Sequence, residues 1–250
     1  MAAPNPEELE LIQEFRLKVQ DLEMSDDLRT DMELLRWIRA RDHDLGQAEL
    51  MLRKHMEWRA TIGLDQISTW ELPKDLQGLL PQGFIGYDDN NCPIVLANIG
   101  KWGSKTVVAN TNREDAIKPH WKMYEELKVR MRGRFTGDGT PVTQVCFIAD
   151  MNGLSLLQTT PQVLRAFVDI VQAFEANYPE FLRTLFLINC PWFIPKIYSL
   201  AKPFLSAKTV DKLHFFGYNQ EEWSRALRKQ IPDSALPTDY GGSNNTYTLT

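Results

Sequence analysis

The sequence predicts an α/β protein in which a small N-terminal helical bundle packs on a larger domain with a mainly parallel sheet. In the first 70 residues, apolar side chains recur at helical spacing. Beyond them, short apolar runs alternate with helical stretches, as strands and crossover helices do in a parallel sheet. A chain of 250 residues is long enough for one large domain with a smaller one beside it.

Residues 1–70 predict three helices with one apolar face each. The second spans about 28–41. The third begins after Asp44, a residue type that caps helix N-termini, and ends near Gly63. Three short amphipathic helices make a bundle that docks on a larger body. The apolar stripe of the first helix consists of Leu9, Ile12, Phe15, Val19 and Leu22.

Residues 71–242 predict the α/β domain, and 243–250 a polar tail that we expect to fray. A turn signal at 87–91 indicates a hairpin at the start of the domain. Thr160 and Asn219 are candidate helix N-caps. The expected strands are 94–99, 142–149, 185–188 and 213–216. The expected helices are 113–132, 161–178 and 220–230.

The composition is that of an ordinary globular protein, with 43% apolar and 24% charged residues. A net charge of -5 argues against nucleic acid as a partner, because nucleic-acid binders usually show a basic footprint. The acidic N-terminus has no signal-peptide core, and no apolar run approaches the ~20 residues of a membrane-spanning helix. The three separated cysteines are typical of a reducing compartment. We therefore expect a cytoplasmic protein.

Sequence motifs of catalysis are incomplete. Residues 104–106 resemble the end of a phosphate-binding loop, but Ile99 and Ser104 occupy its two glycine positions. Residues 153–155 lack the closing glycine of a nucleophile elbow. No two of the four histidines are four residues apart, the spacing that suits a metal site on a helix. We expect no enzyme, no metal site and no cofactor other than a bound ligand.

Two segments have compositions that suggest a surface role. Residues 191–205 are rich in aromatic residues and punctuated by prolines and lysines, which is typical of a short amphipathic element at the mouth of a cavity. Residues 122–134 are basic, and a solvated helix face is favoured there over a face that attracts lipid phosphates.

A series of motifs supports a more specific interpretation by its order and spacing. They are Leu34–Arg41 with Trp58-Arg59, Asp150–Leu154, Asn177–Glu180, Ile188–Pro191, Lys202–Leu205 and Leu236–Gly242. Over about residues 30–242, this pattern resembles the CRAL-TRIO (Sec14-like) lipid-binding family, with the animal Sec14-like subgroup most similar.

The resemblance implies a deep apolar pocket closed by a mobile gate helix at about 193–205. Lys196 and Lys202 would meet lipid headgroups and dock the protein on a membrane surface. The pocket residues that it implies are Tyr124, Phe147, Phe167, Val171 and Phe174. The lipid-facing residues of the gate are Phe193, Ile194, Ile197, Leu200, Phe204 and Leu205.

The resemblance leaves the ligand open. Glu180 and Lys212 match two of the three residues that hold the inositol phosphate in members that bind phosphatidylinositol, but Ala60 stands at the second lysine position. In other members a serine and a threonine support the binding of phosphatidylcholine, and this chain has Val145 and Phe147 at the two corresponding positions. The ligand is then a phospholipid or a terpenoid such as a retinoid, a tocopherol, a squalene-like compound or a carotenoid.

The sequence therefore favours a carrier that binds one hydrophobic lipid and transfers it through transient contact with membranes. The alternative is a lipid-gated regulator that presents its ligand to a partner protein or a lipid kinase. A hydrolase or isomerase that acts on the bound lipid would need a nucleophile and base in the pocket, and the motifs supply neither.

Overall fold

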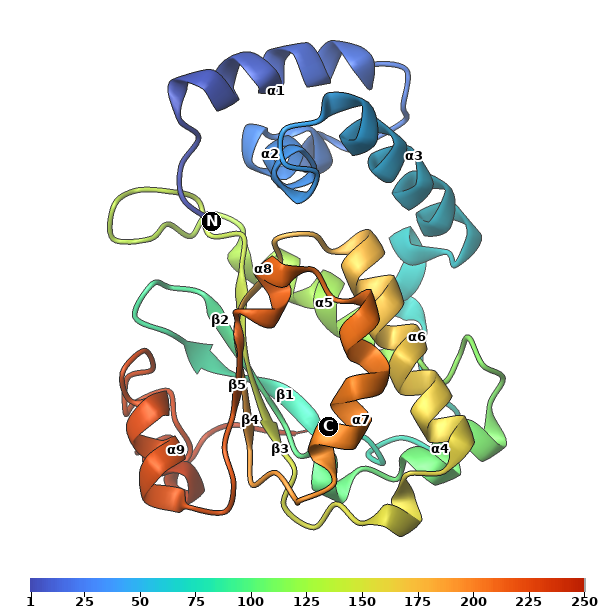
Figure 1. Ribbon diagram of the computed structural model, residues 1–250, viewed down its shortest axis with the longest axis vertical. Helices are drawn as coiled ribbons and strands as arrows, with labels where there is room; N and C mark the ends of the chain where they lie inside the picture. Colours follow the sequence, from blue (N-terminus) through green and yellow to red (C-terminus); the bar gives the residue numbers. More distant parts are fainter. Residues whose placement is uncertain (250) are drawn as a thin grey trace.

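The computed structural model describes residues 1–249 and shows a central sheet with helices on both faces (Figure 1). Within these residues the sheet has five strands in the order β1-β2-β3-β4-β5. β1 and β2 form an antiparallel hairpin, and the other pairs are parallel. The strands are β1 (Gln82–Tyr87), β2 (Pro93–Ala97), β3 (Val145–Asp150), β4 (Leu182–Ile188) and β5 (Leu213–Phe215). The predicted α/β class and the predicted hairpin are both confirmed.

The two faces of the sheet are covered differently (Figure 1). α9 (Gln220–Leu227) and the segment after it fill one face, where Trp223 and Leu227 pack on Ile94 and Ile148 in a continuous core. The other face is covered by four helices. These are α4 (Ser104–Asn110), α5 (Lys118–Met131), α6 (Pro161–Asn177) and α7 (Ile194–Ala201), with the short α8 (Ala207–Val210) after them.

The helices differ from the prediction mainly at the start of α5 and in the presence of α4. α5 begins at Lys118 instead of residue 113, because Pro119 lacks an N–H group and fits only the first turn of a helix. α4 was not predicted, since its short sequence shows no apolar periodicity. The predicted caps are confirmed for α6 and α9, where Thr160 and Asn219 accept hydrogen bonds from the backbone of the first turn.

The N-terminal bundle consists of α1 (Pro6–Lys18), α2 (Asp31–Ala40) and α3 (Leu45–Thr61). Asp44 caps α3 as predicted. Leu9 is exposed, so its predicted place in the apolar stripe is wrong. Glu8 is buried beside it and forms an ion pair with Arg39, with 2.7 Å between Oε1 and Nε. Hydrogen bonds from Arg39 lower the pKa of Glu8 to about 2.

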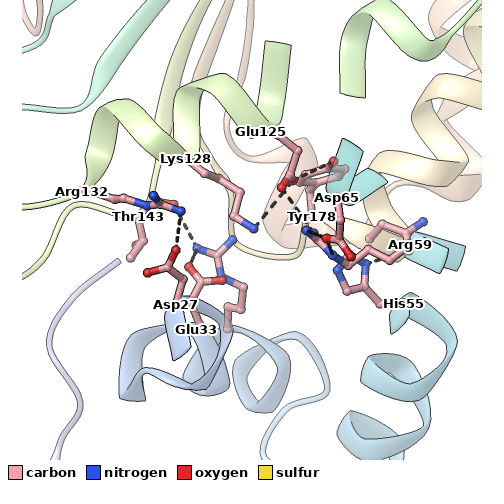
Figure 2. Close-up of polar contacts among 12 residues, drawn as sticks. Asp27, Glu33, His55, Arg59, Asp65, Glu125, Lys128, Arg132, Thr143 and Tyr178 are labelled. Carbon is pink, nitrogen blue, oxygen red and sulfur yellow. Dashed lines mark hydrogen bonds and ion pairs between the residues drawn. The ribbon is translucent and has the colours of Figure 1, made fainter. Parts of the chain in front are cut away.

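The bundle is joined to the α/β domain by buried polar contacts, which Figure 2 shows. Nδ1 of His55 lies 3.1 Å from Oδ1 of Asn177 at the end of α6. The Asn177 amide group donates to the Ala173 carbonyl, so its oxygen faces the imidazole and accepts the hydrogen bond. Arg59 and the hydroxyl of Tyr178 both contact the Glu125 carboxylate, at 3.3 and 3.2 Å.

The C-terminal segment contradicts the expectation of a frayed tail. Residues 243–249 lie along β1, where the side chain of Asn244 donates to the carbonyl of Ile85 at 2.8 Å. Tyr247 and Leu249 pack against the core on the α9 side. The segment is polar in composition, and its few apolar residues give no periodic signal from which packing can be predicted.

The buried contact of His55 predicts a pH-dependent stability. Burial lowers the pKa of His55 from 6.5 to about 3, so the unfolded chain takes up a proton first as the pH falls. This stabilisation is complete above pH 6.5 and is lost towards pH 3. Between pH 7 and pH 5 the His55 contribution to the free energy of unfolding should fall by about 2 kcal/mol.

Urea denaturation of the wild type and of His55→Gln at both pH values measures this contribution as the difference between their pH dependences. His214→Gln, at an exposed position, is the matched control and should behave as the wild type. An identical pH dependence in His55→Gln and the wild type would contradict the assignment.

Candidate functional site

An apolar cavity lies between the open face of the sheet and the helices α4 to α7. Its volume is about 330 Å³. Side chains from both the sheet and these helices line it, and among the lining residues within 1–249 there is no lysine, arginine, aspartate or glutamate. Such a cavity can hold hydrocarbon, and it offers no counter-charge to an ion.

The structure brings together all five side chains that the sequence predicted for the pocket. Tyr124 from α5, Phe147 from β3 and Phe167, Val171 and Phe174 from α6 all line the cavity. The ring of Tyr124 lies 5.9 Å from that of Phe147 and 5.6 Å from that of Phe174, so aromatic contacts join the helices to the sheet.

The predicted gate residues in and around α7 fall into three groups. Ile194, Ile197 and Leu205 line the cavity. Leu200 and Phe204 are exposed on the other side of this segment, so they do not face the cavity as expected. Phe193 is buried below the helix, next to Ala149 and Met151. The lining residues of α7 are Ile194, Ile197, Tyr198 and Ala201, which are paired at a spacing of four residues. Because a helix has 3.6 residues per turn, two steps of three residues from Ile194 turn Leu200 away from this face.

The outer surface near α7 combines positive charge with exposed apolar groups. Lys196 and Lys202 are exposed, as a membrane-facing role requires. Trp192 is 82% exposed and Leu157 is 84% exposed. The sequence analysis missed both residues, since an isolated apolar residue next to a core segment gives no signal of which way its side chain points.

The two predicted headgroup anchors meet in a second, smaller pocket of about 170 Å³ between the N-terminal bundle and the α/β domain. Lys212 Nζ lies 3.2 Å from Glu180 Oε2. Glu180 has a positive φ of 55°, a strained conformation for a residue with a side chain. Phe174 lines both pockets, so they are neighbours. Ala60 is exposed on α3 and lines neither pocket.

A polar tie holds the carboxyl ends of the central strands beside the cavity. Asp150, the last residue of β3, accepts hydrogen bonds from Asn152 N at 2.9 Å and Asn189 Nδ2 at 2.8 Å. The hydroxyl of Tyr240 donates to the other carboxylate oxygen at 2.8 Å. The next residue, Met151, lines the cavity, so this tie fixes part of the cavity wall.

Among the described residues, the side chains that could act as nucleophiles or metal ligands do not form a site. Burial raises the pKa of the thiol of Cys92 to about 12 and raises that of Cys146 further, so neither is an activated nucleophile. Within residues 1–249 no cluster of three or more His, Cys, Asp and Glu side chains has the arrangement of a metal site. Over the same residues, no helix combines the length and apolar character required to cross a bilayer.

The basic stretch 122–134 is engaged in packing. The guanidinium groups of Arg130 and Arg134 stack on the rings of Phe84 and Tyr87 in β1. Lys122 donates to the carbonyl of Trp70 at 2.9 Å. The stretch is therefore only in part the solvated helix face that was predicted, because Arg130 and Arg132 are exposed while Lys122 and Arg134 contact neighbouring segments.

Comparison with known proteins places this fold and cavity in a family. A model of the CRAL/TRIO domain matches residues 79–242, and the chain belongs to this family. It is 28% identical to "Phosphatidylinositol/phosphatidylcholine transfer protein SFH4" of Arabidopsis thaliana, over 95% of this chain and 39% of that protein. It is 25% identical to "Protein real-time" of Aedes aegypti, over 95% of this chain and 37% of that protein. The chain therefore spans less than half the length of these curated relatives.

A solved structure agrees with the assignment of the fold. The crystal structure of Sfh5 superimposes with a TM-score of 0.73 at 15% sequence identity, and the match covers 100% of this chain and 91% of that one. The shared architecture includes the N-terminal bundle as well as the α/β domain, because the whole chain is covered.

The tie at Asp150 predicts a measurable loss of stability when the tyrosine hydroxyl is removed. Tyr240→Phe leaves the carboxylate without its third donor, which should lower the free energy of unfolding by about 1–3 kcal/mol. Urea denaturation checks it, with Tyr218→Phe as the control because Tyr218 is exposed. Equal losses in the two variants would show that the Tyr240 hydroxyl contributes nothing specific.

Proposed function

We propose that the protein carries one hydrophobic lipid in the cavity and transfers it between membranes, without chemical change. The observation that supports this is an apolar cavity between the sheet and the helices α4 to α7, with no charged side chain among its described lining residues. Moving the chains of a lipid with ~30 methylene groups into water costs a free energy on the order of 25 kcal/mol. Free diffusion of the lipid between membranes is therefore very slow. A protein that encloses the chains removes this cost.

The proposal assigns the opening of the cavity to α7. This helix has only eight residues, and Ile194 and Ile197 face the cavity while Lys196 faces solvent. Movement of α7 away from α6 would expose the apolar lining to a bilayer, and its return would close the cavity over the ligand. A short helix with a narrow contact on the rest of the domain suits such a movement.

In the proposed cycle the surface around α7 is the membrane-docking surface. Lys196 and Lys202 attract anionic headgroups, while Trp192 and Leu157 enter the interface between headgroups and acyl chains. The protein would thus reside in the cytoplasm and contact membranes transiently. The basic groups bring it to the surface, and the apolar groups retain it there.

The second pocket gives a phospholipid headgroup a place outside the uncharged cavity. Lys212 supplies a positive charge there, and Glu180 orients it through their ion pair. The name of the Arabidopsis relative, a transfer protein for phosphatidylinositol and phosphatidylcholine, makes a phospholipid one candidate ligand. A terpenoid, which needs no headgroup site, is the other candidate.

The first test is mass spectrometry of the organic extract of the purified protein after incubation with a cell lysate. The proposal expects one lipid at close to one molecule per protein. A protein that stays empty in this lysate and in mixed lipid vesicles would contradict the carrier function.

Crowding of the cavity should reduce its loading. Phe174 lines the cavity, so Phe174→Trp places a larger ring where the ligand would lie, and we expect at most about half of the wild-type occupancy because overpacking typically costs about 1–3 kcal/mol. Native mass spectrometry measures the occupancy. Phe135→Trp, at an exposed position outside the cavity, is the control. Unchanged loading of Phe174→Trp would place the ligand elsewhere.

Charge reversal on the docking surface should slow transfer selectively. For Lys196→Glu with Lys202→Glu, we expect about 30-fold slower transfer between anionic vesicles, since each of the two basic residues near such a surface contributes about 1 kcal/mol. Transfer between neutral vesicles should change little. The control is Lys54→Glu with Lys229→Glu, which makes the same change of charge at exposed positions of the bundle and of the segment after α9. Equal slowing on both vesicle types would reject electrostatic docking.

A further inference from the structure

Several polar side chains line the cavity without a hydrogen bond to another described residue, and three of them are buried. These three are His120 and Tyr124 from α5 and Gln82 from β1. Each is more than nine-tenths buried, with exposed fractions of 6%, 8% and 8%. None of their side chains makes a hydrogen bond to another of residues 1–249. Buried polar groups in proteins are nearly always hydrogen-bonded. We therefore expect a molecule bound in the cavity to form hydrogen bonds with these three side chains.

The three groups lie along one wall. His120 and Tyr124 are four residues apart on α5 and therefore share one face of the helix. The ring of His120 lies 5.4 Å from that of Trp102. The indole N–H of Trp102 donates to the carbonyl of Pro81 at 3.2 Å, and Pro81 directly precedes Gln82. Trp102 thus links the start of β1 to the His120 end of α5.

The surroundings of this wall favour neutral partners. The cavity lining contains no lysine, arginine, aspartate or glutamate among the described residues. Burial lowers the pKa of His120 to about 4 and raises that of Tyr124, so both side chains are uncharged near neutral pH. A phosphate or carboxylate at this place would lose its hydration without an opposite charge to replace it.

We propose that His120 anchors the ligand by a hydrogen bond to a hydroxyl or carbonyl oxygen at the inner end of an otherwise apolar, uncharged lipid. Gln82 and Tyr124 line the same cavity and are further hydrogen-bonding groups for the ligand. The proposal rests on the proposed carrier function and narrows its ligand class. An ionised end-group is excluded from this part of the cavity, and a pure hydrocarbon leaves the imidazole unpaired.

This arrangement makes His120 a determinant of specificity. A site built around a buried hydrogen-bonding group discriminates against an analogue that lacks the matching group, because the protein group is then left unsatisfied. The same site without the imidazole becomes indifferent to the end-group. The effect is measurable as a change of preference, apart from any change in total binding.

The test uses three probes with the same branched chain: phytol, which has a hydroxyl group, phytane, which has none, and phytanic acid, which carries a carboxylate. Delipidated full-length protein is incubated at pH 7.5 with neutral phosphatidylcholine vesicles that contain one probe, and the bound probe is quantified after extraction. The loading ratio of phytol to phytane is compared between variants, so the preference of the vesicles cancels.

We expect this ratio to fall about tenfold in His120→Leu, the effect of one lost hydrogen bond to the ligand. His120→Gln, which keeps a hydrogen-bonding group, should stay within about twofold of the wild type. The exposed His214→Leu is the matched control and should keep the wild-type ratio. His120→Leu should load phytane at least as well as the wild type, which shows that the variant is folded.

Equal ratios in the wild type and His120→Leu would overturn the inference, and so would stronger loading of phytanic acid than of phytol by the wild type. In both cases the wild type still takes up lipid, so the carrier function stands. Failure of the wild type to load any of the three probes would overturn the inference as well. The carrier function would be rejected as well only if the protein also bound no lipid from the cell lysate and from mixed lipid vesicles.

Discussion

The structure depends on holding two apolar walls apart. Apolar surfaces that face one another in water tend to close, and a cavity inside a packed domain costs stability. Here α5 and α6 are fixed to each other and to the N-terminal bundle by the contacts of Tyr178 and Arg59 with Glu125 (Figure 2). At another point on α6, the guanidinium of Arg113 forms a two-pronged ion pair with Asp169. These contacts join α6 to α5 and to the segment before α5 at two points along the cavity wall.

The two faces of the sheet therefore differ in function: one forms a filled core and the other lines the cavity. The face under α9 is a filled core that supplies stability, and Ile94 and Ile148 belong to its most deeply buried part. The face under α5 and α6 carries Phe147 and Leu185 towards the cavity, where their surface is available to a ligand. The bundle belongs to this second task, since His55 reaches across to Asn177 at the end of α6 and supports the cavity wall from outside.

The sequence allowed the fold class, the hairpin and the helix caps to be predicted, because each depends on local patterns of apolar and capping residues. It also placed Tyr124 and the aromatic face of α6 at the cavity, with the help of the family resemblance. It could not separate Leu200 from Ile197, since an apolar residue looks the same on either side of a short helix. The burial of Glu8 was hidden because Arg39, its partner, lies 31 residues away.

The C-terminal segment along β1 has a consequence for solubility. A sheet edge with unpaired backbone groups is a template for pairing with another chain. Here the backbone of Thr248 passes so close to Gly83 that a side-chain carbon at that position would lie 2.5 Å from its carbonyl oxygen, and the opposite edge strand, β5, has only three residues. The C-terminal segment thus packs over the edge strand β1 and occupies its Ile85 carbonyl through Asn244, while β5 offers only a short template for pairing. The opening proposed for α7 would expose an apolar lining, and the covered and short edge strands would then limit a second route to aggregation.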